Sequence, residues 1–353
     1  MAALEAELQL AGEADARVMV VSTSNERSPK VSVVTATYNA ERFIERTLAS
    51  ALGQTFRDFE VVVIDDGSRD GTASVIRRII ASDSRVRLIE QENRGIAAAR
   101  NRGVRESRGA MIAFLDHDDL WHADKLALQT ALLDAHPLAG AASCYSAVID
   151  EDGNYLGWKF GGDANGDVYS EMLVWDIVSG GSVALIRRGS LDAVGPFDEA
   201  LPMRSDWDMW IRIARRFPFA TVPRTLVGYT RSGLGMSRSY SRMLEAGQLV
   251  LDKASHSDPS FGGSRLRFCR ARDLFAVASV CTIDRQTKLA WHYLAQSLSL
   301  TPAPVLTSAR RCGLVVMLML QTVLSVSAFR AVLGAFNRVS WRLQPGRPFL
   351  NGS

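Results

Sequence analysis

The 353-residue sequence has few cysteines and no CxxC pair. Its four cysteines lie far apart in the chain: Cys144, Cys269, Cys281 and Cys312. This spacing argues against a structural zinc site or a disulfide framework, and it is typical of a reducing compartment. A secretory leader is also lacking, because Glu5 and Glu7 precede any apolar run. We therefore expect a cytoplasmic protein.

An excess of one charge is lacking too. The chain holds 41 Lys and Arg against 38 Asp and Glu, a formal net charge of +3. Nothing in this balance points to nucleic acid, and no nucleic-acid partner is expected. Hydrophobic residues make up 47% of the chain, which is ample for a sizeable core, so the composition indicates a globular protein.

Long apolar runs are scarce. Residues 312–329 carry no charge and lie between Arg311 and Arg330, which brings them to the lower limit for a transmembrane helix. Polar residues such as Gln321 and Ser325 weaken that interpretation. A helix on a membrane surface or packed in a core fits the pattern at least as well, and peripheral attachment to the cytoplasmic face of a membrane stays open.

From Lys30 onward, apolar strand patterns alternate with helical patterns. The expected strands are 31–39, 59–68, 86–91 and 109–116, and the expected helices are 40–54, 69–82, 95–107 and 121–133. Asp70 or Thr72 would cap the second helix. This alternation predicts βαβ units with a mostly parallel sheet, whose ligand crevice lies beyond the carboxyl ends of the strands. The polar clusters TATYN, DDGS and DHDD each stand at such an end.

The cluster in AFLDHDDLW crowds three carboxylates: Asp116, Asp118 and Asp119. Like charges this close repel by roughly 1 kcal/mol per pair in water and by more near protein. A divalent cation would neutralise them. By contrast, Asp65, Asp66 and Gly67 taken alone are also ordinary turn residues.

Four successive motifs resemble family 2 glycosyltransferases with the GT-A fold. They are VSVVTATYN with VVVIDDGSRDGT, then ENRGIAAARNRG, then AFLDHDDLW, then VGPFDEALPMRSDWDMWIRIA. The resemblance covers roughly residues 30 to 235 and implies an α/β GT-A fold, Rossmann-like with a mostly parallel central sheet, followed by a helical appendage. The expected division is an N-terminal extension (1–28), the GT-A domain (29–235) and a helical C-terminal region (236–353), which the apolar segment would associate with a membrane.

The resemblance also implies roles for individual residues. The nucleotide and donor sugar would be held by Thr35, Tyr38, Asn39, Asp65, Asp66, Arg94, Gly95, Arg100 and Asp116. Asp116 and Asp118 match the DxD element, which binds Mg²⁺ or Mn²⁺, and hard oxygen ligands suit those ions. Alternatively, Asn93 caps a helix on which Arg100 is a solvated residue. The role of His117 stays open, and Asp119 either caps the following helix or supports the ligands.

A base must remove the proton of an acceptor hydroxyl. The resemblance assigns this role to Asp206, with Ser205 in place of the usual glutamate, and it implies an inverting single displacement. Ser205, Trp207 and Asp208 would border the acceptor. The alternative for Asp206 is a charge that favours the helix dipole.

Residues 140–200 are expected to complete the site, beginning with a hairpin over 143–157 that turns at Asp152-Gly153. The tryptophans in and after this region would either stack on a sugar or pack in the core: Trp158, Trp175, Trp207 and Trp210.

The resemblance implies a nucleotide-sugar donor, by default UDP-linked, and a glycan or lipid-linked acceptor. The processive element QxxRW is absent, because RVSW at 338–341 has a different order and spacing, and this favours single transfer. Two alternatives stay open. One is a non-catalytic protein that binds sugar nucleotides or serves in assembly. The other is a sugar-phosphate nucleotidyltransferase, which would need a Gly-rich basic loop after the first strand, a feature that TATYNAERF lacks.

Overall fold

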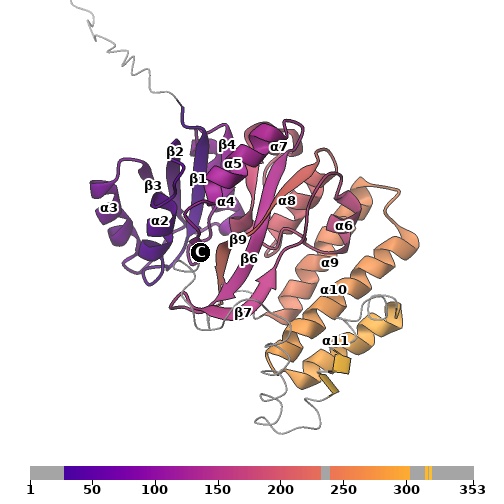
Figure 1. The fold of residues 1–353 in the computed structure, drawn as a ribbon. Coiled ribbons are helices and arrows are strands. Elements are labelled where there is room, and N and C mark those ends of the chain that lie inside the picture. The colour runs from indigo at the N-terminus through magenta and orange to yellow at the C-terminus, as the bar shows by residue number, and fades with distance from the viewer. Residues whose placement is uncertain (1–27, 232–238, 303–314, 317, 320–353) are drawn as a thin grey trace, which may run out of the picture.

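A single mixed sheet of nine strands forms the centre of the protein (Figure 1). The computed structural model describes residues 28–231, 239–302, 315, 316, 318 and 319. The strand order is β3-β2-β1-β4-β8-β6-β9-β5, and β7 pairs with β6. The strands are β1 (Val31–Thr37), β2 (Phe59–Asp65), β3 (Val86–Glu90), β4 (Met111–Phe114), β5 (Leu120–Trp121), β6 (Ala141–Ile149), β7 (Tyr155–Phe160), β8 (Leu185–Arg187) and β9 (Phe219–Thr230).

Helices cover the sheet and continue beyond it. They are α2 (Ile44–Leu52), α3 (Thr72–Ser82), α4 (Ile96–Glu106), α5 (Lys125–Ala135), α6 (Tyr169–Val174), the 3₁₀ turn η1 (Gly181–Val183), α7 (Arg188–Val194), α8 (Ser205–Ala214), α9 (Tyr240–Ser257), α10 (Gly263–Ile283) and α11 (Thr287–Leu300).

The first four strands form the parallel half of the sheet. β1 pairs with β2 and β4, and β2 pairs with β3, all parallel. Every residue of β1 and β2 is buried, as expected for apolar strands covered on both faces. The register sets Thr37 opposite Asp65, so the carboxyl ends of β1 and β2 lie side by side. The predicted α/β fold is confirmed here.

The second half of the sheet is mixed. β8 runs antiparallel to β4 and β6, whereas β6 and β9 are parallel. The predicted hairpin is present as β6 and β7, with Gly153 at φ 86° in its turn. The helix expected from residue 121 begins only at Lys125, because Leu120 and Trp121 pair with β9 as the short strand β5. Helix α7 follows β8 directly.

The expected C-terminal helical region is present. α9 and α10 run alongside α8 and α6, and α11 packs on α10 (Figure 1). Apolar residues of α9, such as Val250 and Leu251, belong to the same buried core as the sheet. No helix of the described part of the chain is both long and apolar enough to cross a membrane. The apolar segment 312–329 falls almost wholly outside the described residues, as does the predicted extension 1–28, and the predicted domain boundaries stay predictions.

Candidate active site

Asp66, after β2, organises the loop that leads into α4. Its Oδ1 accepts hydrogen bonds from Gln91 Nε2 (2.7 Å) and from the backbone N–H of Arg94 (2.9 Å). Its Oδ2 accepts the N–H of Gly95 at 2.8 Å. Gly95 has φ 88°, a conformation in which glycine is favoured, and a Cβ there would meet open space. Asp66 therefore shapes the backbone where the sequence predicts diphosphate contacts, and its own contact with a donor stays a prediction.

The residues expected to hold the nucleotide at the ends of β1 and β2 differ in how deeply they are buried. Tyr38 is 42% exposed and presents its ring at the surface. Asn39 is tied to the neighbouring turn, since its Oδ1 accepts the N–H of Arg69 at 2.8 Å. Asp65 is buried and accepts the N–H of Ser68 at 3.0 Å. Thr35 is completely buried, and its hydroxyl has no hydrogen-bond partner among the described residues, so it lies beneath the surface on which Tyr38 stands.

Arg100 is the buried cation of the site rather than a solvated helix residue. Its Nη2 donates a hydrogen bond of 2.6 Å to Oδ1 of Asp116. The guanidinium lies 5.9 Å from the ring centroid of Phe114 and 5.5 Å from that of Phe197. Burial alone would lower the pKa of Arg100, but the carboxylates of Asp116 and Asp206 raise it above its usual value. Arg100 is thus firmly charged, with Asp116 and Asp206 in its field.

The three carboxylates that follow β4 retain unbalanced negative charge. Burial raises the pKa of Asp118, and the neighbouring Asp116 raises it further. Burial, Asp118 and Asp116 raise the pKa of Asp119 well above its usual value. Oδ1 of Asp119 accepts the N–H of Thr230 in β9 at 3.0 Å, so Asp119 braces the cluster against the sheet and does not cap α5.

This donor set fits a hard divalent cation, because it offers carboxylate oxygens and a surplus of negative charge. One oxygen of Asp116 is occupied by Arg100, which leaves Oδ2 of Asp116 and the Asp118 carboxylate as candidate ligands. Within the described ranges no three His, Cys, Asp or Glu side chains are grouped closely enough to hold a metal ion. These two carboxylates alone are fewer ligands than a divalent cation usually takes.

Asp206 occupies the first turn of α8. Its side chain is half-buried, and its Oδ1 accepts the N–H of Trp207 at 2.9 Å. The predicted acceptor-side residues are more deeply placed. Ser205 is buried, Trp207 is buried and donates from Nε1 to the carbonyl of Met172 at 2.7 Å, and Asp208 forms ion pairs at 2.9 Å with Arg212 and with the Lys253 ammonium. Asp206 is the carboxylate of this turn that is not committed to an ion pair.

The candidate stacking tryptophans separate by exposure. Trp207 and Trp210 are in the core, whereas Trp175 is 38% exposed. The side chain of Trp158 lies outside the described residues. Among the described members of this set, Trp175 alone presents an accessible ring.

Sequence reasoning missed Asp176. Its Oδ1 accepts the N–H groups of Val178 (3.0 Å) and Ser179 (2.9 Å), which fixes the loop before η1. In that turn, Oγ of Ser182 accepts the N–H of Asp116 at 3.0 Å. Burial and the nearby Asp206 carboxylate raise the pKa of Asp176 to about 7. In the sequence, Asp176 precedes a Ser-Gly-Gly segment that is typical of an ordinary turn. Nothing in the neighbouring residues therefore predicts that it lies near Asp206.

The raised pKa of Asp176 predicts a pH-dependent stability. An unfolded aspartate loses its proton near pH 4, whereas folded Asp176 keeps it to about pH 7. Between these values the folded state holds a proton that the unfolded state has lost, so the free energy of unfolding should fall as the pH rises from about 4 to 7. Urea unfolding of wild type and Asp176→Asn across this range should show a smaller fall in the variant. Parallel curves would contradict the assignment.

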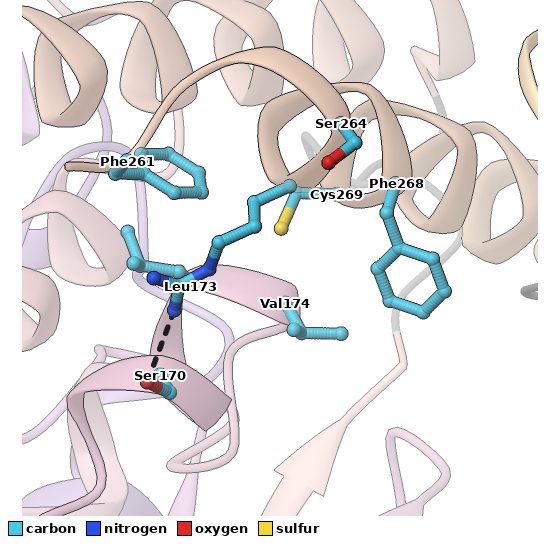
Figure 2. A pocket seen from close by; sticks show the side chains of 8 residues that line it. Ser170, Leu173, Val174, Phe261, Ser264, Phe268 and Cys269 are labelled. Carbon is cyan, nitrogen blue, oxygen red and sulfur yellow. Dashed lines mark hydrogen bonds between the residues drawn. The ribbon is translucent and has the colours of Figure 1, made fainter.

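A cavity of about 280 Å³ lies elsewhere, between α6 and α10 (Figure 2). Phe261, Phe268 and Leu173 contribute its apolar lining, and Arg265 Nη2 donates to Ser170 Oγ at 3.2 Å. None of the predicted site residues lines it. The candidate active site is therefore the set of strand ends and the start of α8, not this cavity.

The fold and site together define an α/β protein of the GT-A type. Residues 32–194 match the family model described as glycosyl transferase family 2. This match agrees with the resemblance of the sequence motifs to family 2 glycosyltransferases.

Relatives of known sequence agree with this assignment. The chain is 32% identical over 194 residues to an uncharacterized glycosyltransferase of Rickettsia bellii, an alignment that covers 54% of this chain and 27% of the relative. It is 29% identical over 226 residues to chondroitin synthase of Escherichia coli, covering 64% and 32%. A putative teichuronic acid biosynthesis glycosyltransferase, TuaG of Bacillus subtilis, is 37% identical over 129 residues, covering 36% and 51%. The chain spans only about a quarter to a half of the length of these relatives.

Two solved structures share the fold. Residues 1–349 of Staphylococcus aureus TarS, in complex with UDP-GlcNAc, superpose with a TM-score of 0.58 at 18% identity, covering 89% of this chain and 93% of that one. The mannosyltransferase PcManGT of Pyrobaculum calidifontis, in complex with GDP-Man and Mn²⁺, also gives 0.58, at 22% identity, covering 89% and 86%. At these identities the likeness concerns the fold alone.

Proposed function

We propose that the protein transfers a sugar from a nucleotide-sugar donor to an acceptor hydroxyl, with Asp206 as the base. The observation that carries this is the shared electrostatic field around Arg100, which links the Asp116 carboxylate after β4 to the Asp206 carboxylate on α8. In this proposal the donor diphosphate lies beside the first carboxylate and the acceptor hydroxyl beside the second. The relatives named glycosyltransferases support the same activity.

Each group has a defined task in this proposal. Tyr38 stacks on the nucleobase, and Asp65 accepts hydrogen bonds from the base. The loop shaped by Asp66 presents its backbone, with Arg94, to the diphosphate. Asp206 removes the proton of the acceptor hydroxyl, whose oxygen attacks the anomeric carbon from the face opposite the leaving diphosphate. Inversion in a single displacement follows, and no protein nucleophile is needed.

Asp116 and Asp118 would hold Mg²⁺ or Mn²⁺ in this proposal. When bound, the cation stabilises the negative charge that builds on the leaving diphosphate. The structure of a relative of the same fold in complex with GDP-Man and Mn²⁺ supports a divalent ion. The hydrogen bond from Arg100 fixes the Asp116 carboxylate in place, which would prepare it as a ligand.

The donor and acceptor are proposed by class. A UDP-linked sugar is the default donor, which a fold relative in complex with UDP-GlcNAc supports. The acceptor is a glycan or a lipid-linked intermediate, and attachment to the cytoplasmic face of a membrane through the C-terminal region belongs to the same proposal. The division at residues 29 and 235 would separate this region from the catalytic domain.

Calorimetric titration tests the site. UDP, GDP and dTDP are added to wild type and to Asp118→Ala, with and without Mn²⁺, and Mn²⁺ is also added alone. Because the described carboxylates do not form a metal cage by themselves, we expect Mn²⁺ alone to bind weakly and one nucleotide to bind at micromolar Kd only with Mn²⁺. Asp118→Ala should abolish that dependence. If no nucleotide binds under either condition, the transferase proposal fails and a non-catalytic protein is the better account.

A further inference from the structure

Arg204, two residues before the proposed base, is held in an unusual conformation. Arg204 lies immediately before α8 and has φ 57°, in the left-handed region that residues other than glycine rarely adopt. Its Nη1 donates a hydrogen bond of 2.6 Å to Oδ1 of Asp273, in α10. A conformation of this kind persists only where its surroundings hold it. The contact with Asp273 restrains the Arg204 side chain.

This ion pair is built into the packing between α8, α9 and α10. The Asp273 side chain is 6% exposed, and the Arg204 guanidinium also lies 5.4 Å from the ring centroid of Trp207. Gly247 of α9 faces the pair, and a Cβ there would overlap Oδ2 of Asp273 and Nη1 of Arg204. Glycine is a poor helix former, so its presence inside α9 is explained by the room that the ion pair needs.

Lys253 of α9 provides a second link between the C-terminal helices and the first turn of α8. The Lys253 ammonium of α9 lies 2.9 Å from Oδ1 of Asp208 and 2.7 Å from Oδ2 of Asp198. The C-terminal helices therefore form ion pairs with Arg204 and Asp208, the residues two positions before and two positions after Asp206.

We propose that Asp273 is a positioning residue for sugar transfer: through Arg204 it fixes the first turn of α8, and thereby the place of Asp206 relative to the acceptor. This inference rests on the proposed function, in which Asp206 is the base. Displacement of a reacting group by about 1 Å can cost on the order of a hundredfold in rate. The C-terminal helices are thus part of the transferase machinery, and not only an appendage to it.

The test compares Asp273→Asn and Gly247→Ala with a matched control, Asp284→Asn. Asp284 follows α10 and pairs with Arg231, the residue after β9, and it also accepts a hydrogen bond from Tyr240 of α9. Turnover is measured as the nucleoside diphosphate released from the donor whose nucleotide binds in the titration, at a temperature where thermal melts show every variant folded. Deuterium uptake of a peptide covering residues 203–212 reports on the turn itself.

We expect Asp273→Asn and Gly247→Ala to lower kcat about tenfold or more, to leave the donor KM and nucleotide Kd within about twofold, and to speed deuterium uptake of the 203–212 peptide. Asp284→Asn should change none of these. The inference is overturned if the two variants keep wild-type kcat, or if the control lowers kcat equally. Failure of the proposed function is distinguishable, because Asp206→Asn would then retain wild-type turnover. In that case deuterium uptake alone decides whether Asp273 orders the turn, and unchanged uptake overturns the inference.

Discussion

Asp206→Asn should lower sugar transfer by about 10²–10⁴-fold while nucleotide affinity stays unchanged. The loss has this size because general base catalysis typically contributes that much, and an amide accepts no proton at neutral pH. The substitution preserves shape, and the oxygen that accepts the N–H of Trp207 is retained, so the start of α8 should keep its structure. The measurement is donor turnover with and without acceptor, alongside calorimetric titration of the nucleotide.

The matched control is Asp192→Asn, an exposed carboxylate on α7 next to α8. It should leave turnover and nucleotide affinity as in wild type. If Asp206→Asn retained more than about a tenth of wild-type turnover, another group would be the base. Asp176, whose carboxyl lies in the field of Asp206, would be the next residue to substitute.

The parts of the site that the sequence predicts are those fixed by local pattern. β1, β2 and β4 are rich in apolar and β-branched residues, so their ends could be located, and parallel pairing then requires Asp65 and Asp116 to share one edge of the sheet. The position of Asp206 in a first helical turn follows from the apolar spacing after it. These expectations needed no knowledge of distant contacts.

The parts that the sequence did not predict depend on contacts between residues far apart in the chain. Arg100 is polar and helical, so its pattern suits a solvated face, yet packing against Phe114 and Phe197 buries it. Asp273 lies 69 residues beyond Arg204, and nothing in the sequence of α10 marks it as a partner of the site. Trp175 is exposed whereas Trp210 is buried, and the sequence alone did not predict which of the two would be accessible.

Arg100→Met should destabilise the fold strongly. Removing Arg100 leaves the Asp116 carboxylate, whose side chain is 28% exposed, without its partner, and this costs about 1–3 kcal/mol, less than for a fully buried charge. Here the loss would leave Asp116 among carboxylates that already repel one another, as the raised pKa values of Asp118 and Asp119 indicate. We therefore expect the free energy of unfolding to fall by about that amount at pH 7, measured by urea unfolding.

The pH dependence of the stability lost in Arg100→Met distinguishes uncompensated charge from lost packing as its cause. A carboxyl whose folded pKa is raised binds its proton more tightly in the folded state, so its destabilising effect shrinks as the pH falls below that pKa. The loss of stability in Arg100→Met should accordingly be smaller at pH 5 than at pH 7, and Arg100→Met with Asp116→Asn should recover stability but not transfer.

The matched control is Arg102→Met, on the same helix with a partly exposed ion pair to Glu106, which should cost less than about 0.5 kcal/mol. A deficit independent of pH, with no recovery in the double variant, would show that Arg100 stabilises through packing on the two phenylalanines. Recovery of stability in the double variant would instead show that Arg100 stabilises the fold by neutralising the carboxylates beside it.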